Sequence, residues 1–275
     1  MDATTMRFGA FGLILLLMAV AEAIAPRRAL RFGRKRWPSN LGIVVIDSII
    51  VRLLIPGGAV TAALWAAAHD FGLFNQLDWT ENIEIVIAII LLDLFIYGQH
   101  VLFHAVPALW RLHMVHHADR DIDVTTGLRF HPLEIILSML IKMAIVILFG
   151  MPVMAVILFE IVLNGMAMFN HANVRLAKKM DGLLRLLVIT PDVHRVHHSI
   201  IRSETNSNYG FNLSLWDRLF GTFREQPEHG HDGMTIGLEH LQTAPTHQLG
   251  FMLRLPFGGD IGQYPILKSK GDRHE

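Results

Sequence analysis

The stretch LLDLFIYGQHVLFH, residues 91–104, joins an apolar run to two histidines near its end. It belongs to an apolar segment, residues 83–103, that is long enough to cross the ~30 Å hydrocarbon core of a bilayer as a helix. His100 and His104 are four residues apart, which places them about 40° apart on one face of that helix. This stretch therefore predicts a membrane-spanning helix that presents two imidazoles at one end.

The composition of the chain agrees with a membrane protein. Of its 275 residues, 52% are hydrophobic and 17% are charged, whereas roughly 25% are charged in a soluble domain. Lys plus Arg and Asp plus Glu number 24 each, so the formal net charge of zero lacks the positive excess that is typical of nucleic-acid binding. The absence of cysteine excludes disulfides, thiolate metal sites, iron–sulfur clusters and a cysteine nucleophile.

Three further apolar segments complete the predicted membrane region. Residues 8–25 form a spanning segment; a cleaved signal peptide is the alternative, but the basic residues follow this run rather than precede it. Residues 41–68 are interrupted by PGG at 56–58, which predicts a kink or two half-helices. Residues 135–169 are too long for one straight crossing, and GMP at 150–152 divides them into a hairpin. We expect an all-α integral membrane protein with about four transmembrane helices in two hairpins.

The distribution of basic residues predicts the orientation. Six Lys and Arg residues lie within residues 27–36 and none within residues 69–82. By the positive-inside rule, residues 27–36 face the cytoplasm and residues 69–82 face the opposite side of the membrane. The chain then returns to the cytoplasmic side near His104. We therefore expect the histidines on the cytoplasmic face of a membrane such as the bacterial inner membrane.

Ten of the 16 histidines lie between residues 100 and 198, and eight of these fall into three motifs. The motifs are HVLFH at 100–104, HMVHH at 113–117 and HRVHH at 194–198. In a helix, the three histidines of HxxHH leave through one arc of about 100°, and the adjacent pair diverges by the same angle. This histidine content would produce only about 0.05 HxxHH matches per chain by chance. The motifs predict metal binding by neutral imidazoles, which are ligands for Fe, Zn or Cu.

Eight imidazoles exceed the about four ligands of a single metal ion. Because each adjacent pair diverges, its two members suit different metals, and we predict a dinuclear centre. The predicted ligands are His100, His104, His113, His116, His117, His194, His197 and His198, with His171 and His131 as further candidates. His131 precedes a proline, so an interfacial turn residue is the alternative for it. Residues 190–192, Thr-Pro-Asp, predict the start of a short helix that carries the last motif.

Asp93 lies on the same predicted helix face as His100 and His104, deeper in the membrane. A carboxylate at that depth is costly and needs a partner. Metal-bound imidazoles often donate their second N–H to such a group. We therefore predict that Asp93 supports the metal ligands or lines a substrate channel; the alternative is a hydrogen bond to neighbouring helices.

These motifs resemble the fatty acid hydroxylase / sterol desaturase superfamily of integral-membrane, histidine-rich di-iron oxygenases. The resemblance extends from about residue 85 to residue 224. The stretches that carry it are QHVLFH (99–104), LWRLHMVHH (109–117), TTGLRFHPLE (125–134), FNHANV (169–174), TPDVHRVHHS (190–199) and NYGFNLSLWDRLFGTF (208–223). The stretch 125–134 is most similar to the branch that contains the alkylglycerol ether monooxygenases and their bacterial relatives.

The resemblance implies a helical membrane stalk under a cytosolic helical cap that holds two iron ions, which zinc could replace in purified protein. It also implies O2-dependent hydroxylation or desaturation of a C–H bond in a lipid such as a fatty acyl chain, a sterol or an ether lipid. The eight motif histidines match the three principal histidine boxes of the family, and His171 matches its looser intermediate box. That box often supplies two histidines, so His131 is the candidate to complete the set.

No fused cytochrome b5 segment is visible, so the resemblance implies a separate electron donor, such as a cytochrome b5- or ferredoxin-like reductase system. The expected division is 1–84 for the N-terminal transmembrane segments and basic cytoplasmic loop, 85–224 for a fatty acid hydroxylase-like catalytic domain, and 225–275 for a polar cytoplasmic tail with little core of its own.

Two other functions use the same ligands without O2 chemistry. A protein that transports or stores zinc or iron would carry ionisable residues along several crossing helices, whereas these histidines gather at one side. A zinc hydrolase would need a carboxylate as general base close to the metal, and the nearest candidates are Asp119, Asp121, Asp123 and Glu134.

Overall fold

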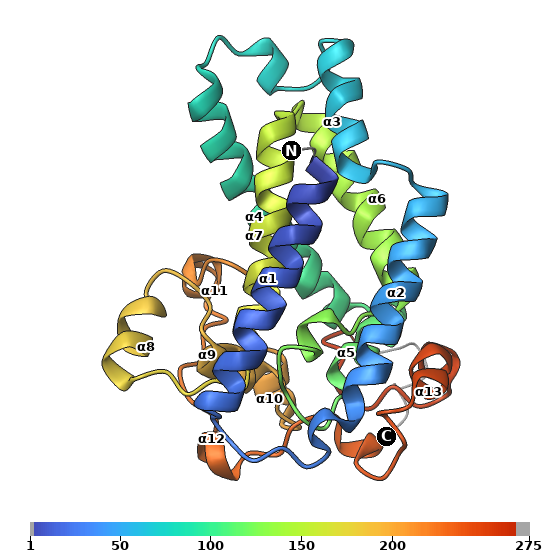
Figure 1. The fold of residues 1–275 in the computed structure, drawn as a ribbon, viewed down its shortest axis with the longest axis vertical. Helices are drawn as coiled ribbons and strands as arrows, with labels where there is room; N and C mark the ends of the chain where they lie inside the picture. Colours follow the sequence, from blue (N-terminus) through green and yellow to red (C-terminus); the bar gives the residue numbers. More distant parts are fainter. Residues whose placement is uncertain (1–2, 268–275) are drawn as a thin grey trace.

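A computed structural model describes residues 3–267, and the regular secondary structure among them is helical (Figure 1). The β pairing among these residues is limited to isolated bridges. The predicted all-α class is therefore confirmed for this part of the chain. Residues 1–2 and 268–275 lie outside the described residues, and with them the end of the predicted tail and His274.

Six helices make up the upper part of the molecule in Figure 1, and two of them, α1 and α2, continue into the lower part, where further helices gather. The upper helices are α1 (Ala3–Ile24), α2 (Trp37–Leu54), α3 (Gly58–Ala68), α4 (Glu81–Ala105), α6 (Pro132–Phe149) and α7 (Val153–Asn170). The shorter helices, which we call the cap, are α5 (Pro107–His117), α8 (Lys178–Leu184), α9 (Pro191–His197), α10 (Arg202–Thr205), α11 (Leu215–Leu219), α12 (Gly230–Gly233) and α13 (Leu249–Arg254). Short 3-10 turns are η1 (Gly33–Arg36), η2 (Phe74–Gln76), η3 (Thr126–Leu128), η4 (Glu239–Leu241) and η5 (Leu255–Phe257).

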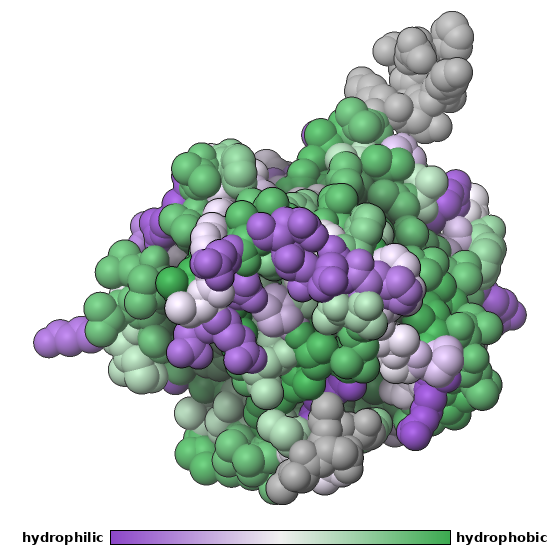
Figure 2. Space-filling view, turned by 90° about the horizontal axis from the view of Figure 1, so that it is seen from above, coloured by the Kyte–Doolittle hydropathy of each residue, from purple (hydrophilic) through white to green (hydrophobic). Residues whose placement is uncertain are grey.

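Five segments are long and apolar enough to cross a membrane. They are Thr5–Ile24, Gly33–Ala68, Glu81–Ala105, Pro132–Phe149 and Val153–Asn170. The expectation of about four spans counted residues 135–169 as a single hairpin segment. By length and composition, each of the two helices in that hairpin, α6 and α7, is a candidate span. Many large apolar side chains on these helices are exposed, and hydrophobic surface surrounds a hydrophilic band at the upper end of the molecule (Figure 2). Such apolar flanks are what a lipid environment requires.

The two predicted interruptions of the apolar segments fall at glycines with positive φ. Gly57 has φ +77° and separates α2 from α3, and a Cβ there would lie 1.9 Å from Thr61 Oγ1. Gly150 has φ +65° and ends α6, with its N–H donating to Ile147 O at 3.1 Å. Only glycine enters this region of φ without strain. The predicted half-helices and the predicted hairpin therefore both occur.

Residues 225–267, for which we expected little core of their own, contribute to a core that they share with α5. Leu238, Met252 and Tyr264 are buried in one cluster with Trp110 of α5. Trp110 Nε1 also donates to Ile261 O at 2.9 Å. The apolar residues of this region are sparse and irregularly spaced, and they become a core only by packing against α5. The cap thus includes the C-terminal region and encloses the helix that carries HMVHH.

Candidate metal centre

The structure brings nine of the ten predicted histidines into two groups, each of which could hold a metal ion. The first group is His100, His104, His113, His117 and His197, and the second is His116, His171, His194 and His198. Within each group, one ligand nitrogen per residue lies within 4.8 Å of all the others. All nine side chains are buried, with exposed fractions of 0–4%. These are therefore two compact sets of nitrogen donors in the interior of the protein.

Four helices meet to form the two groups where the upper helices join the cap. The last turns of α4 supply His100 and His104, and α5 supplies three histidines. His171 directly follows α7. The last three are two histidines of α9 and His198, which directly follows that helix. The adjacent pair of α5 divides between the groups, and so does the adjacent pair of α9, as the helical geometry predicts. The rings of His117 and His198 stack with centroids 4.6 Å apart across the boundary. The two groups therefore adjoin each other.

Backbone carbonyl groups fix the orientation of several rings. His100 donates its Nδ1–H to the carbonyl oxygen of Tyr209 at 2.7 Å. His197 donates its Nδ1–H to the carbonyl oxygen of Ser207, also at 2.7 Å. In the second group, His171 donates in the same way to the carbonyl oxygen one turn earlier in α7, at 2.7 Å. A carbonyl oxygen only accepts, so Nδ1 must carry the proton and Nε2 keeps a free lone pair.

The Nε2 atoms of the fixed rings converge. Nε2 of His100 lies 3.0 Å from that of His113 and 3.1 Å from that of His197. Nε2 of His171 lies 3.0 Å from those of His116 and His194. Because Nδ1 carries the proton in His100 and His197, their facing Nε2 atoms cannot hydrogen-bond to each other. Two nitrogens bound about 2.1 Å from one ion at a right angle lie about 3.0 Å apart, so the observed spacing fits shared metal ligands.

The electrostatics of the site favours neutral imidazoles. Burial lowers the pKa of His113 to about 3, and that of His171 also to about 3. The same cause lowers the pKa of His197 and His198 well below the ordinary value. Metal binding requires the unprotonated nitrogen. The rings are therefore held in the form that binds metal, with no proton to displace at neutral pH.

Several buried ring nitrogens have no hydrogen-bond partner among residues 3–267. Both nitrogens of His117 and both of His198 are in this state, as are Nε2 of His104 and Nδ1 of His194. Each unsatisfied buried polar atom costs about 1–3 kcal/mol, and so many in one place need an explanation. Metal coordination would satisfy one nitrogen in each ring.

Glu134 supports a ligand histidine, a role that the sequence analysis did not predict for it. His113 Nδ1–H donates to Glu134 Oε1 at 2.7 Å, and the carboxylate is buried. A carboxylate behind a metal-bound imidazole fixes its tautomer and raises its basicity. The amide oxygen of Asn206 likewise fixes the tautomer of His104, accepting from Nδ1–H at 3.1 Å. The available signal was the position of Glu134 in the first turn of the helix that starts after His131.

Asp93 does not bond to any ligand histidine among the described residues. Its Oδ2 accepts from Trp216 Nε1 at 2.8 Å and from the N–H of Leu213 at 3.2 Å. It therefore anchors α11 and the preceding loop, which includes the Tyr209 carbonyl that orients His100. The bond to Trp216 of α11 is the alternative stated for Asp93, a hydrogen bond to a neighbouring helix.

His131 is not brought to either group. It is the N-cap of α6, where its Nδ1 accepts from the N–H of Leu133 at 3.2 Å. Its Nε2 donates to the carbonyl oxygen of Leu253 at 3.2 Å. Both ring nitrogens are therefore engaged in positioning α6, which carries Glu134. Of the two further ligand candidates, the structure brings His171 to the centre and leaves His131 outside it.

The acidic residues that follow α5 are engaged away from the histidines. Arg36 is buried and forms ion pairs with Asp119, Asp121 and Asp123. Burial alone would raise the pKa of Asp119, but Arg36 and Arg129 beside it hold that pKa below its ordinary value. These three carboxylates therefore hold the start of α2 to the loop after His117.

The fold and site thus define a helical membrane protein with a histidine-rich metal centre. A sequence profile described as fatty acid hydroxylase matches residues 85–222, and the chain belongs to this family. The matched region begins in α4 and contains all nine clustered histidines.

Two kinds of named relatives are similar to the chain. The ornithine lipid hydroxylase OlsE of Rhizobium tropici is 32% identical over 206 residues, which cover 70% of this chain and 61% of that protein. Alkylglycerol monooxygenase from Homo sapiens is 31% identical over 167 residues, 61% of this chain and 36% of that protein. The enzyme from Danio rerio is 30% identical over 177 residues, 64% of this chain and 37% of that protein. The matched part of the chain thus spans under two thirds of these relatives. No solved structure is significantly similar to the chain.

Proposed function

We propose that this protein is a membrane-bound di-iron oxygenase that uses O2 to hydroxylate or desaturate a C–H bond of a lipid such as a fatty acyl chain, a sterol or an ether lipid. The observation that carries the proposal is the pair of adjoining histidine groups, of five and four donors, at one end of the apolar helices. The printed names of the relatives, a lipid hydroxylase and lipid monooxygenases, support the same class of reaction.

The donor set fits iron. Imidazole nitrogen suits iron as well as zinc and copper, and the two groups supply enough donors for two ions. Two iron ions bound there would supply the redox chemistry by which O2 is activated. Hydroxylation then consumes two electrons and two protons per turnover, placing one oxygen atom in the lipid and the other in water. The electrons would come from a separate donor, such as a cytochrome b5- or ferredoxin-like system.

The residues of this chain would bind, orient and shield. Backbone carbonyl groups and Glu134 hold the imidazoles with their lone pairs directed inward. The buried position of all nine histidines keeps bulk water away. Since the centre lies where the apolar helices end, a lipid chain would reach it from the bilayer. We place the centre at the cytoplasmic face of a membrane such as the bacterial inner membrane, because residues 27–36 are basic.

The arrangement favours an oxygenase over the two other functions. A metal transporter would need donors along a path across the membrane, but the nine histidines form one compact layer. A zinc hydrolase would need a free carboxylate as base. Asp119, Asp121 and Asp123 are ion-paired with Arg36, and Glu134 accepts a hydrogen bond from His113.

The proposal is tested with protein purified without oxygen in the presence of iron. Iron per chain is measured first, and then 18O2, a reductant and extracted membrane lipids are added. We expect two iron ions per chain and a lipid product that carries 18O, or an alkene with consumption of O2. Iron-loaded protein that consumes no O2 with any lipid, or a chain that holds a single zinc ion, would contradict the proposal.

A matched pair of variants separates the centre from the remaining histidines. His197→Ala removes a buried donor of the five-histidine group, and we expect metal binding to fall and turnover to stop. His229→Ala removes an exposed histidine outside both groups, and we expect full metal content and activity. Full metal content in the His197 variant would remove this residue from the ligand set.

A further inference from the structure

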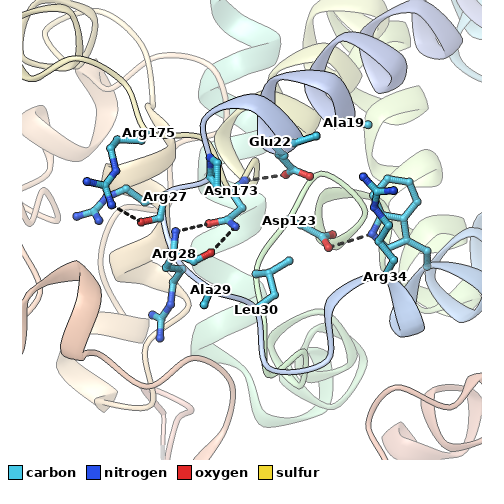
Figure 3. Close-up of a pocket in the computed structure, with 13 residues that line it drawn as sticks. Ala19, Glu22, Arg27, Arg28, Ala29, Leu30, Arg34, Asp123, Asn173 and Arg175 are labelled. Carbon is cyan, nitrogen blue, oxygen red and sulfur yellow. Dashed lines mark hydrogen bonds between the residues drawn. The ribbon is translucent and has the colours of Figure 1, made fainter.

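A pocket of about 450 Å³ lies away from the two histidine groups, where α1 ends and α2 begins (Figure 3). The end of α1, residues 26–30, the start of α2 and the stretch after His171 form its walls. Asn173 ties these walls together, since its side chain accepts from the N–H of Arg28 at 3.1 Å and donates to Arg28 O at 2.8 Å. The pocket is therefore built by contacts between segments far apart in the sequence.

Four arginines line the pocket: Arg27, Arg28, Arg34 and Arg175. Arg27 pairs with two aspartates. The other three guanidinium groups have no carboxylate partner within residues 3–267. Arg28 donates to two carbonyl oxygens, Arg34 lies over the Trp37 ring at 5.5 Å, and Arg175 donates to Arg27 O at 3.1 Å. Arg175 and Arg34 lie at opposite ends of the pocket in Figure 3.

The two acidic residues of the pocket are already engaged with the protein. Glu22 Oε1 accepts from the N–H groups of Val124 and Asn173, both at 2.7 Å. Asp123 Oδ2 accepts from Arg36 and from Trp37 Nε1. Their charges are directed at these donors, whereas Arg34 and Arg175 are exposed and uncompensated. The pocket therefore has a positive excess that an anion would neutralise.

One side of the pocket is apolar and continues onto the membrane-spanning part of the molecule. Ala19 and Ala23 belong to the last turns of α1, within the candidate span Thr5–Ile24, and Trp37 opens α2. Tryptophan favours the interface between membrane and water. A ligand here meets guanidinium groups on one side and hydrocarbon on the other, which is the environment of a phospholipid. Basic pockets between membrane helices on the cytoplasmic side bind anionic lipid headgroups in this way.

We propose that this pocket binds the phosphate headgroup of an anionic phospholipid from the leaflet on the cap side of the membrane. Arg34 and Arg175 would attract the phosphate by their charge, and the guanidinium group beside it would donate charge-assisted hydrogen bonds. The acyl chains would lie along α1 past Ala19 and Ala23. The site does not depend on the proposed oxygenase chemistry, since none of its residues belongs to the histidine groups.

The test uses the full chain in a neutral detergent, titrated with phosphatidylglycerol or phosphatidylcholine and followed by native mass spectrometry. We expect phosphatidylglycerol to bind at least tenfold more tightly than phosphatidylcholine. The double variant Arg34→Ala/Arg175→Ala removes two charges at the membrane surface, and we expect it to lose at least tenfold in affinity for phosphatidylglycerol. Equal affinity for the two lipids, or unchanged affinity in the double variant, would overturn the proposal.

Four further measurements keep the result specific. The variant Lys178→Ala/Lys179→Ala removes the same charge from exposed positions outside the pocket, and an equal loss there would mean general surface attraction. The metal content of each variant reports whether it has folded. Ala23→Trp narrows the apolar side without changing charge, and we expect it to weaken lipid binding. Full displacement of the lipid by millimolar inorganic phosphate would instead identify a site for free anions.

Discussion

The hydrogen bond between His113 and Glu134 allows a graded test of how the metal centre is supported. The two side chains are buried and 2.7 Å apart. Glu134→Leu removes the acceptor, and a hydrogen bond to a charged group contributes about 1.5–3 kcal/mol, which corresponds to roughly 10–150-fold in affinity. Glu134→Gln can still present an oxygen to Nδ1–H, but the bond loses about half its strength because the charge is gone. We expect a loss of roughly 3–10-fold for this variant.

The assay is competition for the metal against a chromophoric chelator under anaerobic conditions. Because His113 belongs to the five-histidine group, one metal should leave more readily from the Glu134 variants and the other should leave as in the wild type. The control is Glu81→Leu, at the exposed start of α4, which should change neither. If Glu134→Leu retains both metals as tightly as the wild type, the reasoning about this carboxylate is refuted.

Three other predictions follow from contacts around the centre. His131→Ala removes the N-cap of α6, so metal analysis should find the full metal content and denaturant unfolding should show a loss of about 1 kcal/mol of stability. His131→Asn should restore most of that stability. Loss of metal in His131→Ala would identify His131 as a ligand. In Gly127→Ala, a Cβ would lie 2.3 Å from a carbonyl oxygen of α7 and 3.0 Å from His171 Nδ1, so we expect a loss of about 1–3 kcal/mol and weaker metal binding. Gly182→Ala meets nothing within 4 Å and should unfold at the wild-type midpoint or above; equal stability of the two glycine variants would contradict the packing. Since burial lowers the pKa of His113 and His171 to about 3, each neutral ring contributes stability that is present above pH ~6.5 and is lost as pH falls toward 3. The metal-free protein should therefore lose about 2 kcal/mol per ring between pH 7 and pH 5, and unfolding midpoints that do not vary over this range would argue against buried neutral rings.

The local features of the site were predictable from the sequence because they depend on helical periodicity. The spacing of HMVHH and HRVHH fixes which way each imidazole leaves its helix, and the structure divides both adjacent pairs between the two groups as this spacing requires. The breaks at Gly57 and Gly150 were equally readable, because a positive φ strongly favours glycine.

The supporting contacts could not be predicted because they join residues that are distant in the sequence or that use the backbone. Carbonyl oxygens orient His100 and His197, and every residue has a carbonyl group. Asp93 was rightly placed on the face of the ligands, but its partner Trp216 is 123 residues away. His131 shared the residue type and the region of the ligands, and only the structure distinguishes a helix cap from a ligand.

The most direct test of the central claim is the number of metal ions bound per chain, measured by elemental mass spectrometry on purified protein. Two adjoining groups of neutral nitrogen donors predict two ions per chain. They also predict that His197→Ala and His198→Ala each weaken a different one of these ions, because the two neighbours belong to different groups. A wild-type chain that binds one ion or none after metal loading would contradict the account.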